Sequence, residues 1–140
     1  IGKLQTNKVK FAVNLFDYIH SVDNEKLAKK ISDESNKISK NIKIFIQVNI
    51  GNEKQKSGID KNNLHNLIDF CKNLNLNIAG LMCIPPMELN SAKFFEDMKI
   101  LTKNYSFKDL SMGMSSDYIE AAKNSATYLR IGSGIFGMRA

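Results

Sequence analysis

Apolar residues recur along this chain in two alternating patterns. Leu64, Leu67 and Ile68 follow the i, i+3, i+4 spacing of an amphipathic helix. The segment 42–49 is instead almost continuously apolar, as expected for a strand that is covered on both faces. The two patterns predict helices over residues 7–16, 24–40, 60–74, 91–103 and 116–124, and strands over residues 18–22, 42–49, 78–84, 110–113 and 127–132.

The regular alternation of strands and helices predicts an α/β protein built from parallel βαβ units. Periodicity alone does not distinguish an open sheet from part of a barrel. Ile1-Gly2 reads as the end of a further strand, so we expect the chain to be a fragment of a longer product. Its 140 residues are too few to close an eight-unit barrel, which usually needs about 250.

The second predicted helix has a recognisable start and a clear apolar side. Asp23 or Asn24 precedes it and can serve as the N-cap, because short polar side chains accept hydrogen bonds from the free backbone N–H groups of the first turn. We expect Leu27, Ile31 and Ile38 to face inward from this helix.

The charge and the cysteines exclude several function classes. The formal net charge is +6, and 18 of the 20 basic residues are lysine. Proteins that bind nucleic acids tend to use clustered arginines with aromatic platforms, so we expect a solvated basic surface and no nucleic-acid partner. No apolar run approaches the roughly 18 residues of a membrane span. Cys71 and Cys83 lack metal-ligand spacing, and we expect buried, reduced thiols in a cytoplasmic protein.

Hydroxyl and glycine residues follow the last two predicted strands. Ser115 comes after the strand 110–113, and Gly132 and Ser133 end the strand 127–132. Adjacent strand ends of this kind suit a phosphate group, because free backbone N–H groups attract the anion and glycine allows close approach. The alternatives are that Ser115 or Ser116 caps the helix after it and that Gly132-Ser133 is an ordinary turn.

Arg130 lies two residues before Gly132, so its side chain should face the same side of the strand as the Gly132 position. A buried arginine needs an acceptor, and Asp109 or Asp117 could supply one as a structural ion pair. Met82, read by itself, fits core packing better than ligand contact. His20 fits a satisfied core or rim histidine, since no Ser/His/Asp set accompanies it.

Five ordered motifs resemble one known family. They are IGKLQTNKVK at 1–10, SVD at 21–23, VNIGNEKQKSGI at 48–59, GLMCIPP at 80–86 and LSMGMSSDYIEAAKNSATYLRIGSGIFGMR at 110–139. On these motifs the chain is identified as a member of the pyridoxal phosphate homeostasis protein family. The resemblance implies an α/β partial (β/α)8 TIM barrel of the alanine racemase N-terminal type, from the end of strand three through strand eight. Residues 1–140 would then be a single, incomplete barrel domain that binds pyridoxal 5′-phosphate.

The resemblance also implies roles for individual residues. Ser115, Gly132 and Ser133 would hold the phosphate group, although the family more often has threonine at the position of Ser133. Arg130 would face the pyridine nitrogen, which disfavours protonation of the ring and suits a carrier. Met82 would border the ring. The lysine that binds the aldehyde belongs to the first strand in the family, and none of the lysines present matches it.

The function implied is a non-catalytic carrier or buffer of pyridoxal 5′-phosphate that is monomeric at full length and can deliver it to apoenzymes. Alone, the 140-residue chain should bind weakly and associate through exposed strand edges. Two alternatives stay open: a pyridoxal phosphate-dependent amino-acid racemase-like enzyme, and a binding module without a cofactor.

Overall fold

The computed structural model describes residues 2–87 and 90–138, in which strands and helices alternate. The strands are β1 Tyr18–Val22, β2 Lys43–Val48, β3 Asn77–Cys83, β4 Asp109–Met114 and β5 Tyr128–Arg130. The helices are the 3-10 turn η1 Thr6–Lys8 and α1 Val9–Leu15, α2 Glu25–Lys37, α3 Leu64–Asn73, α4 Ser91–Asn104, α5 Tyr118–Lys123 and α6 Ser133–Phe136. The predicted alternation is confirmed. The further strand expected at Ile1-Gly2 depends on Ile1, which lies outside the described residues.

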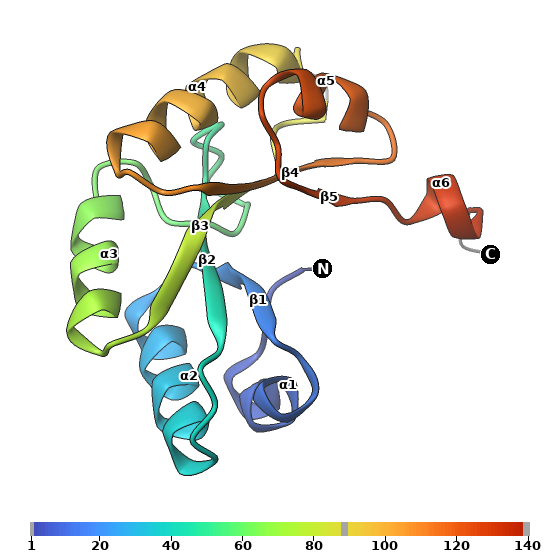
Figure 1. The fold of residues 1–140 in the computed structure, drawn as a ribbon. Helices are drawn as coiled ribbons and strands as arrows, with labels where there is room; N and C mark the ends of the chain where they lie inside the picture. The colour runs from blue at the N-terminus through green and yellow to red at the C-terminus, as the bar shows by residue number, and fades with distance from the viewer. Residues whose placement is uncertain (1, 88–89, 139–140) are drawn as a thin grey trace.

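The five strands form one parallel sheet in the order β1-β2-β3-β4-β5. Because this order follows the chain, a helix crosses over between each strand and its neighbour, and Figure 1 shows α2, α3 and α4 along the outer side of the sheet. The sheet is strongly curled, since the rings of Tyr18 and Tyr128 in the two edge strands have centroids only 5.5 Å apart. The predicted parallel α/β architecture is confirmed.

Both faces of the central strands are buried, and their side chains alternate between two layers. Ile44 and Ile46 of β2 belong to the main hydrophobic core, together with Ile31 of α2 and Ile68 of α3. Phe45, between them, faces the inside of the curl and lies with its ring centroid 5.2 Å from that of Tyr128. This two-sided burial explains the continuous apolar run in the sequence.

Helix α2 begins as predicted and ends earlier. The side chain of Asn24 accepts a hydrogen bond from the backbone N–H of Leu27 at 2.8 Å, so Asn24 is the N-cap. Leu27 and Ile31 are buried as expected. The prediction for Ile38 is wrong: the helix stops at Lys37, and Ile38 leaves the helical path with 44% of its surface exposed.

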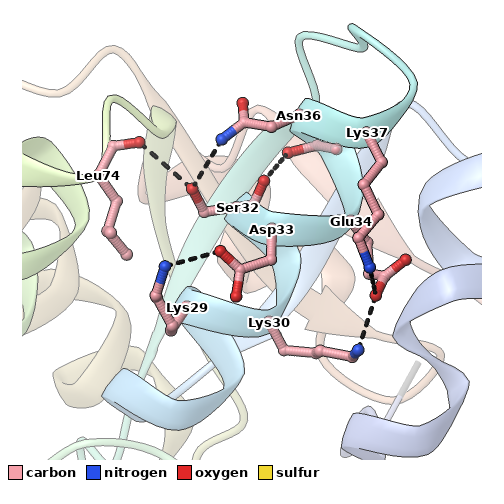
Figure 2. Close-up of polar contacts among 9 residues, drawn as sticks. Lys29, Lys30, Ser32, Asp33, Glu34, Asn36, Lys37 and Leu74 are labelled. Atoms are coloured by element: carbon pink, nitrogen blue, oxygen red, sulfur yellow. Dashed lines mark hydrogen bonds and ion pairs between the residues drawn. The ribbon is translucent and has the colours of Figure 1, made fainter.

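Polar contacts link side chains along α2 (Figure 2). Lys30 and Lys37 both donate to Oε1 of Glu34, at 2.6 and 2.8 Å. These two hydrogen bonds lower the pKa of Glu34 to about 2. Ser32 donates to the carbonyl of Leu74 at 3.5 Å and connects α2 to the end of α3. The lysine-rich surface here is therefore partly paired within the helix, which agrees with the solvated basic surface expected from the sequence.

Two boundaries differ from the sequence prediction for local reasons. The helix expected from residue 60 begins at Leu64, because the Asp60 carboxylate accepts from the backbone N–H groups of Asn62 and Asn63 and forms a turn first. The last strand ends at Arg130 instead of residue 132, and the residues from Ser133 onward form the short helix α6.

Gly80 marks an irregular and very close contact between β3 and its neighbours. The β2–β3 register steps from Ile44–Ile78 to Phe45–Gly80, so β3 carries an extra residue there. On the other side Gly80 faces Asp109 of β4, and a Cβ added at Gly80 would lie 1.8 Å from the Asp109 carbonyl oxygen. Only glycine permits this approach of the two backbones.

Several kinds of site are absent from residues 2–87 and 90–138. No helix there is long and apolar enough to cross a membrane, and no three His, Cys, Asp or Glu side chains gather where they could hold a metal ion. Cys71 and Cys83 are buried free thiols, as predicted. Burial raises the pKa of each thiol to about 12, so neither is a reactive thiolate at neutral pH.

Candidate functional site

The loops that follow β4 and β5 meet at Ser115. The backbone N–H groups of Gly132 and Gly134 donate to Oγ of Ser115, at 3.2 and 3.0 Å. The two strand ends are therefore side by side, as their neighbouring places in the sheet require. The capping alternative for Ser115 is wrong: Asp117 is the N-cap of α5, and the Ser115 hydroxyl is engaged by the glycine loop instead.

The glycine loop has the properties of a place where an anion can sit. A Cβ added at Gly132 would meet nothing within 4 Å, so the space beside its backbone is open. Ser133 is the first residue of α6, and its backbone N–H therefore has no acceptor inside that helix. Because α5 and α6 have only six and four residues, their helix dipoles contribute little. Backbone N–H groups and the Ser115 hydroxyl are the groups that could bind a phosphate.

Arg130 points into the curled sheet and is almost completely buried, with 6% of its surface exposed. Its Nη1 donates to Oγ of Ser111 at 2.7 Å, and its Nη2 donates to the carbonyl of Cys83 at 2.8 Å. Among the described residues, its Nε is buried and has no acceptor. The guanidinium is thus held through its two terminal nitrogens by β4 and β3, and its Nε stays buried without an acceptor.

The alternative of an ion pair between Arg130 and Asp109 or Asp117 does not describe what we find. No salt bridge joins Arg130 to a carboxylate within residues 2–87 and 90–138, and Asp117 accepts instead from the backbone N–H of Met114 at 2.7 Å. Burial lowers the pKa of Arg130 from its ordinary, very high value. Since that value is so high, the guanidinium stays positively charged at neutral pH.

His20 completes the polar cluster from the opposite side. Its Nδ1 lies 2.8 Å from Oγ of Ser111, and its ring stacks on Phe45 with centroids 4.3 Å apart. Burial, followed by the positive charge of Arg130, lowers the pKa of His20 from 6.5 to about 4. His20 is therefore a neutral, satisfied histidine, as the sequence analysis expected.

A cavity of ≈ 500 Å³ opens on the inner side of the sheet, between the edge strands β1 and β5. Its volume is within the range of small-molecule sites. Met82 and Arg130 line it, together with His20 and Tyr128. Met82 is 1% exposed, so it packs in the inner layer and borders the cavity at the same time.

The predicted site residues thus fall into two neighbouring groups. Met82 and Arg130 line the cavity. Ser115, Gly132 and Ser133 do not line it; they lie in the loops just past Ile131, the lining residue that follows β5. Two separate groups of residues would suit a pyridoxal ester, because its phosphate and its ring need different partners. The roles of these residues remain predictions.

Sequence reasoning did not single out Ser111 or Gly134. Ser111 is a polar residue between Leu110 and Met112 of the predicted strand, whose side chains pack in the main core, so alternation along the strand could have placed it on the inner face. Gly134 is in the quoted GSG motif, but its contact with Ser115 depends on α6 turning the chain back, and that short helix carries no apolar periodicity.

Lowering the pH from about 6.5 to about 4 should destabilise the fold through His20. The unfolded chain takes up a proton near pH 6.5, whereas folded His20 does so only near its pKa of about 4. The contribution of neutral His20 to the free energy of unfolding is therefore full above pH 6.5, declines as the pH falls, and is completely lost below about pH 4. Partial exposure limits the loss to about 1–2 kcal/mol.

Urea unfolding at several pH values in this window tests the prediction, with His20→Phe as the comparison. The free energy of unfolding should fall less steeply with acidity in His20→Phe than in the unchanged chain. Parallel slopes would contradict the assignment, because carboxylates such as Glu34 titrate equally in both proteins.

Comparison with known proteins identifies the family. Residues 1–140 match the family described as alanine racemase, N-terminal domain. The chain belongs to this family. Among curated relatives, the pyridoxal phosphate homeostasis protein of Aquifex aeolicus is 37% identical, and the match covers 99% of this chain and 65% of that protein. The protein of the same name from Synechocystis is 36% identical, with 99% and 68% covered.

Solved structures of the family agree with the fold. PipY of Synechococcus elongatus with PLP bound superposes with a TM-score of 0.89 at 32% identity, covering 98% of this chain and 68% of PipY. Alanine racemase of Clostridium difficile has a TM-score of 0.72 at 10% identity, covering 99% of this chain and 38% of that one, which shows a shared fold alone. These likenesses confirm the predicted partial TIM barrel.

The chain is shorter than its relatives. It spans 65% of the Aquifex aeolicus protein, and 63% of the pyridoxal phosphate homeostasis protein of Vibrio cholerae, to which it is 37% identical with 99% of this chain covered. About a third of each relative therefore has no counterpart in residues 1–140.

Proposed function

We propose that this chain is part of a protein that binds pyridoxal 5′-phosphate and takes part in its homeostasis as a non-catalytic carrier. One observation carries the proposal: Arg130, which points inward and lines the cavity, ends the strand that leads into a glycine loop whose N–H groups converge on the Ser115 hydroxyl. The named relatives and the PLP-bound PipY structure support the same ligand.

The residues present fit the two ends of this cofactor. Gly132 leaves open space beside its backbone, and Ser115, Gly132 and Ser133 would hold the phosphate there. Arg130, which lines the cavity, would donate to the pyridine nitrogen, and Met82 would border the ring. When bound in an enzyme, the cofactor supplies an electron sink for amino-acid chemistry. A charged guanidinium that donates to the ring nitrogen keeps a proton off it, which weakens that sink and suits a carrier.

The geometry also suggests why this chain alone should hold the ligand weakly. It offers groups for the phosphate and for the ring nitrogen. The family resemblance assigns the lysine that binds the aldehyde to a first strand with no match among residues 1–140. We therefore propose that residues 1–140 form an incomplete barrel domain with the phosphate half of the site. Apoenzymes that need the cofactor are the proposed recipients, in a reducing cytoplasm compatible with the free thiols of Cys71 and Cys83.

A Gly132→Ala substitution tests the phosphate site. The variant should fold normally, since its Cβ meets nothing within 4 Å, yet that methyl group would occupy the space proposed for the phosphate. Affinity for pyridoxal 5′-phosphate should fall about tenfold, equivalent to ~1.4 kcal/mol. Affinity for pyridoxal, which lacks the phosphate, should be unchanged.

Amide shifts in ¹H–¹⁵N spectra during titration with each compound measure both affinities, even in the millimolar range. In the unchanged chain, pyridoxal 5′-phosphate should shift the signals of Gly132, Ser133 and Gly134. Equal weakening of both compounds by Gly132→Ala, or shifts confined to other residues, would refute the phosphate assignment.

The racemase-like alternative has one observation in its favour, the shared fold with alanine racemase. At 10% identity this likeness does not extend to activity. Racemisation of alanine by residues 1–140 joined to the strands that the family resemblance places before them would favour the enzyme over the carrier.

A further inference from the structure

Three side chains from three separate strands form a continuous hydrogen-bonded series inside the curled sheet. His20 of β1 contacts Ser111 of β4, and Ser111 contacts Arg130 of β5, at 2.8 and 2.7 Å. Ser111 lies in the middle and is completely buried, with none of its surface exposed. The direction of each hydrogen bond in this series can be deduced from the chemistry of the groups.

The direction follows from the arginine. A guanidinium carries only donors, so Nη1 of Arg130 donates and Oγ of Ser111 accepts. The Ser111 hydroxyl has one hydrogen of its own, which needs an acceptor because an unsatisfied buried donor costs about 1–3 kcal/mol. The nearby Nδ1 of His20 is that acceptor only if it carries no proton.

The surroundings of His20 favour the same state. A positive charge on His20 would be repelled by the buried Arg130. The His20 ring is also stacked against Phe45, which shields it from water. A neutral imidazole with an unprotonated Nδ1 carries its proton on Nε2. The series therefore runs in one direction, from the guanidinium through the hydroxyl to the imidazole.

We propose that His20 is a positioning residue for Arg130: by accepting the Ser111 proton, it keeps Ser111 an acceptor and so fixes the guanidinium at the wall of the cavity that Arg130 lines. The carbonyl of Cys83 holds Nη2 at the same time, so both terminal nitrogens of the guanidinium are anchored. The proposal rests on the proposed function only for the identity of the acceptor, the pyridine nitrogen.

The first test needs neither a ligand nor a variant. Long-range ¹H–¹⁵N correlation spectra report each imidazole nitrogen separately, and the chain contains two histidines, His20 and His65. His20 should show a protonated Nε2 and an unprotonated Nδ1 at neutral pH. A protonated Nδ1 would overturn the proposal. Magic-angle-spinning spectra give the same answer if the isolated chain associates.

The second test asks whether His20 acts through Arg130. The variants are His20→Phe and Ser111→Ala, and the matched controls are the exposed His65→Phe and the buried Ser35→Ala, which lies on α2 away from the cavity. The chain has two arginines, so two Nε–H signals are expected. Exchange of the Arg130 Nε proton with water should become at least about tenfold faster in both variants and stay unchanged in both controls. An unchanged rate in His20→Phe would overturn the proposal.

Ligand titration separates this inference from the proposed function. If pyridoxal 5′-phosphate binds, His20→Phe should weaken it and its phosphate-free form pyridoxal by the same factor, about tenfold, because the ring contact is affected and the phosphate contact is not. Equal binding to His20→Phe and to the unchanged chain would overturn the positioning role. Failure of the ligand to bind at all would overturn the proposed function, whereas the imidazole spectra and the exchange rates would still decide the positioning role.

Discussion

Joining residues 1–140 to the segment of PipY that precedes its match should give a monomer that holds pyridoxal 5′-phosphate at least about 100-fold more tightly than the 140-residue chain. The family resemblance implies that this segment contains strands one and two, most of strand three, and the lysine that binds the aldehyde. We expect the added segment to supply the missing half of the site and to cover the open side of the sheet.

The open side is visible in the structure. The sheet ends at β1 and β5, neither of which pairs with a further strand among the described residues. Large apolar side chains are exposed near both ends of the sheet: Phe11, Leu15, Phe16, Leu129, Ile135 and Phe136. Figure 1 shows α6 extending away from the other helices, past the end of β5. An unpaired edge with apolar side chains promotes association, so the 140-residue chain should self-associate.

Light scattering after size-exclusion chromatography and equilibrium titration of the cofactor check both halves of this expectation. The control is the same fusion with the predicted first-strand lysine of PipY replaced by methionine, which should stay monomeric and lose most of the gain in affinity. A sharp, monodisperse monomer from the 140-residue chain would contradict the association argument. A fusion that binds no better than the chain alone would contradict the division of the site.

Replacing Gly80 by alanine should destabilise the fold by about 3 kcal/mol or more. The new Cβ would lie 1.8 Å from the carbonyl oxygen of Asp109, and that atom belongs to the backbone of the neighbouring strand. No rotamer change can relieve the contact, so β3 and β4 would have to separate. The strands that carry Met82 and Ser111, which are paired across this junction, would separate with them.

Urea unfolding followed by circular dichroism measures the effect as a shift in midpoint. Gly132→Ala is the matched control, because the same substitution there meets nothing within 4 Å and should leave the midpoint unchanged. Equal midpoints for Gly80→Ala and Gly132→Ala would show that the junction of β3 and β4 is looser than described.

Much of the fold could be predicted from the sequence, because it depends on local apolar spacing. The strand 18–22 and the helix 91–103 agree with β1 and α4 within one residue, since their apolar positions and flanking polar residues leave few alternatives. The need of a buried Arg130 for acceptors was also foreseen, and the structure supplies Ser111 and the carbonyl of Cys83. Proximity of Ser115 to the Gly132 loop followed from parallel neighbouring strands.

What could not be predicted depends on contacts between distant segments. His20 and Ser111 are 91 residues apart, and only the curl of the sheet brings them together. The close approach at Gly80 depends on an extra residue in β3, and a register shift leaves no mark on apolar spacing. Ile38 was misjudged because apolar periodicity continues past the point where the backbone of α2 stops being helical.

The ring contacts inside the sheet have a mechanical consequence. Tyr18 and Tyr128 touch across the interior, and Phe45 supports Tyr128 from β2, so the two outermost strands are propped at a set separation. The curvature is therefore self-supporting instead of being imposed by a closed ring of strands. Any further strands that pair with β1 and β5 would therefore join a sheet that is already curved.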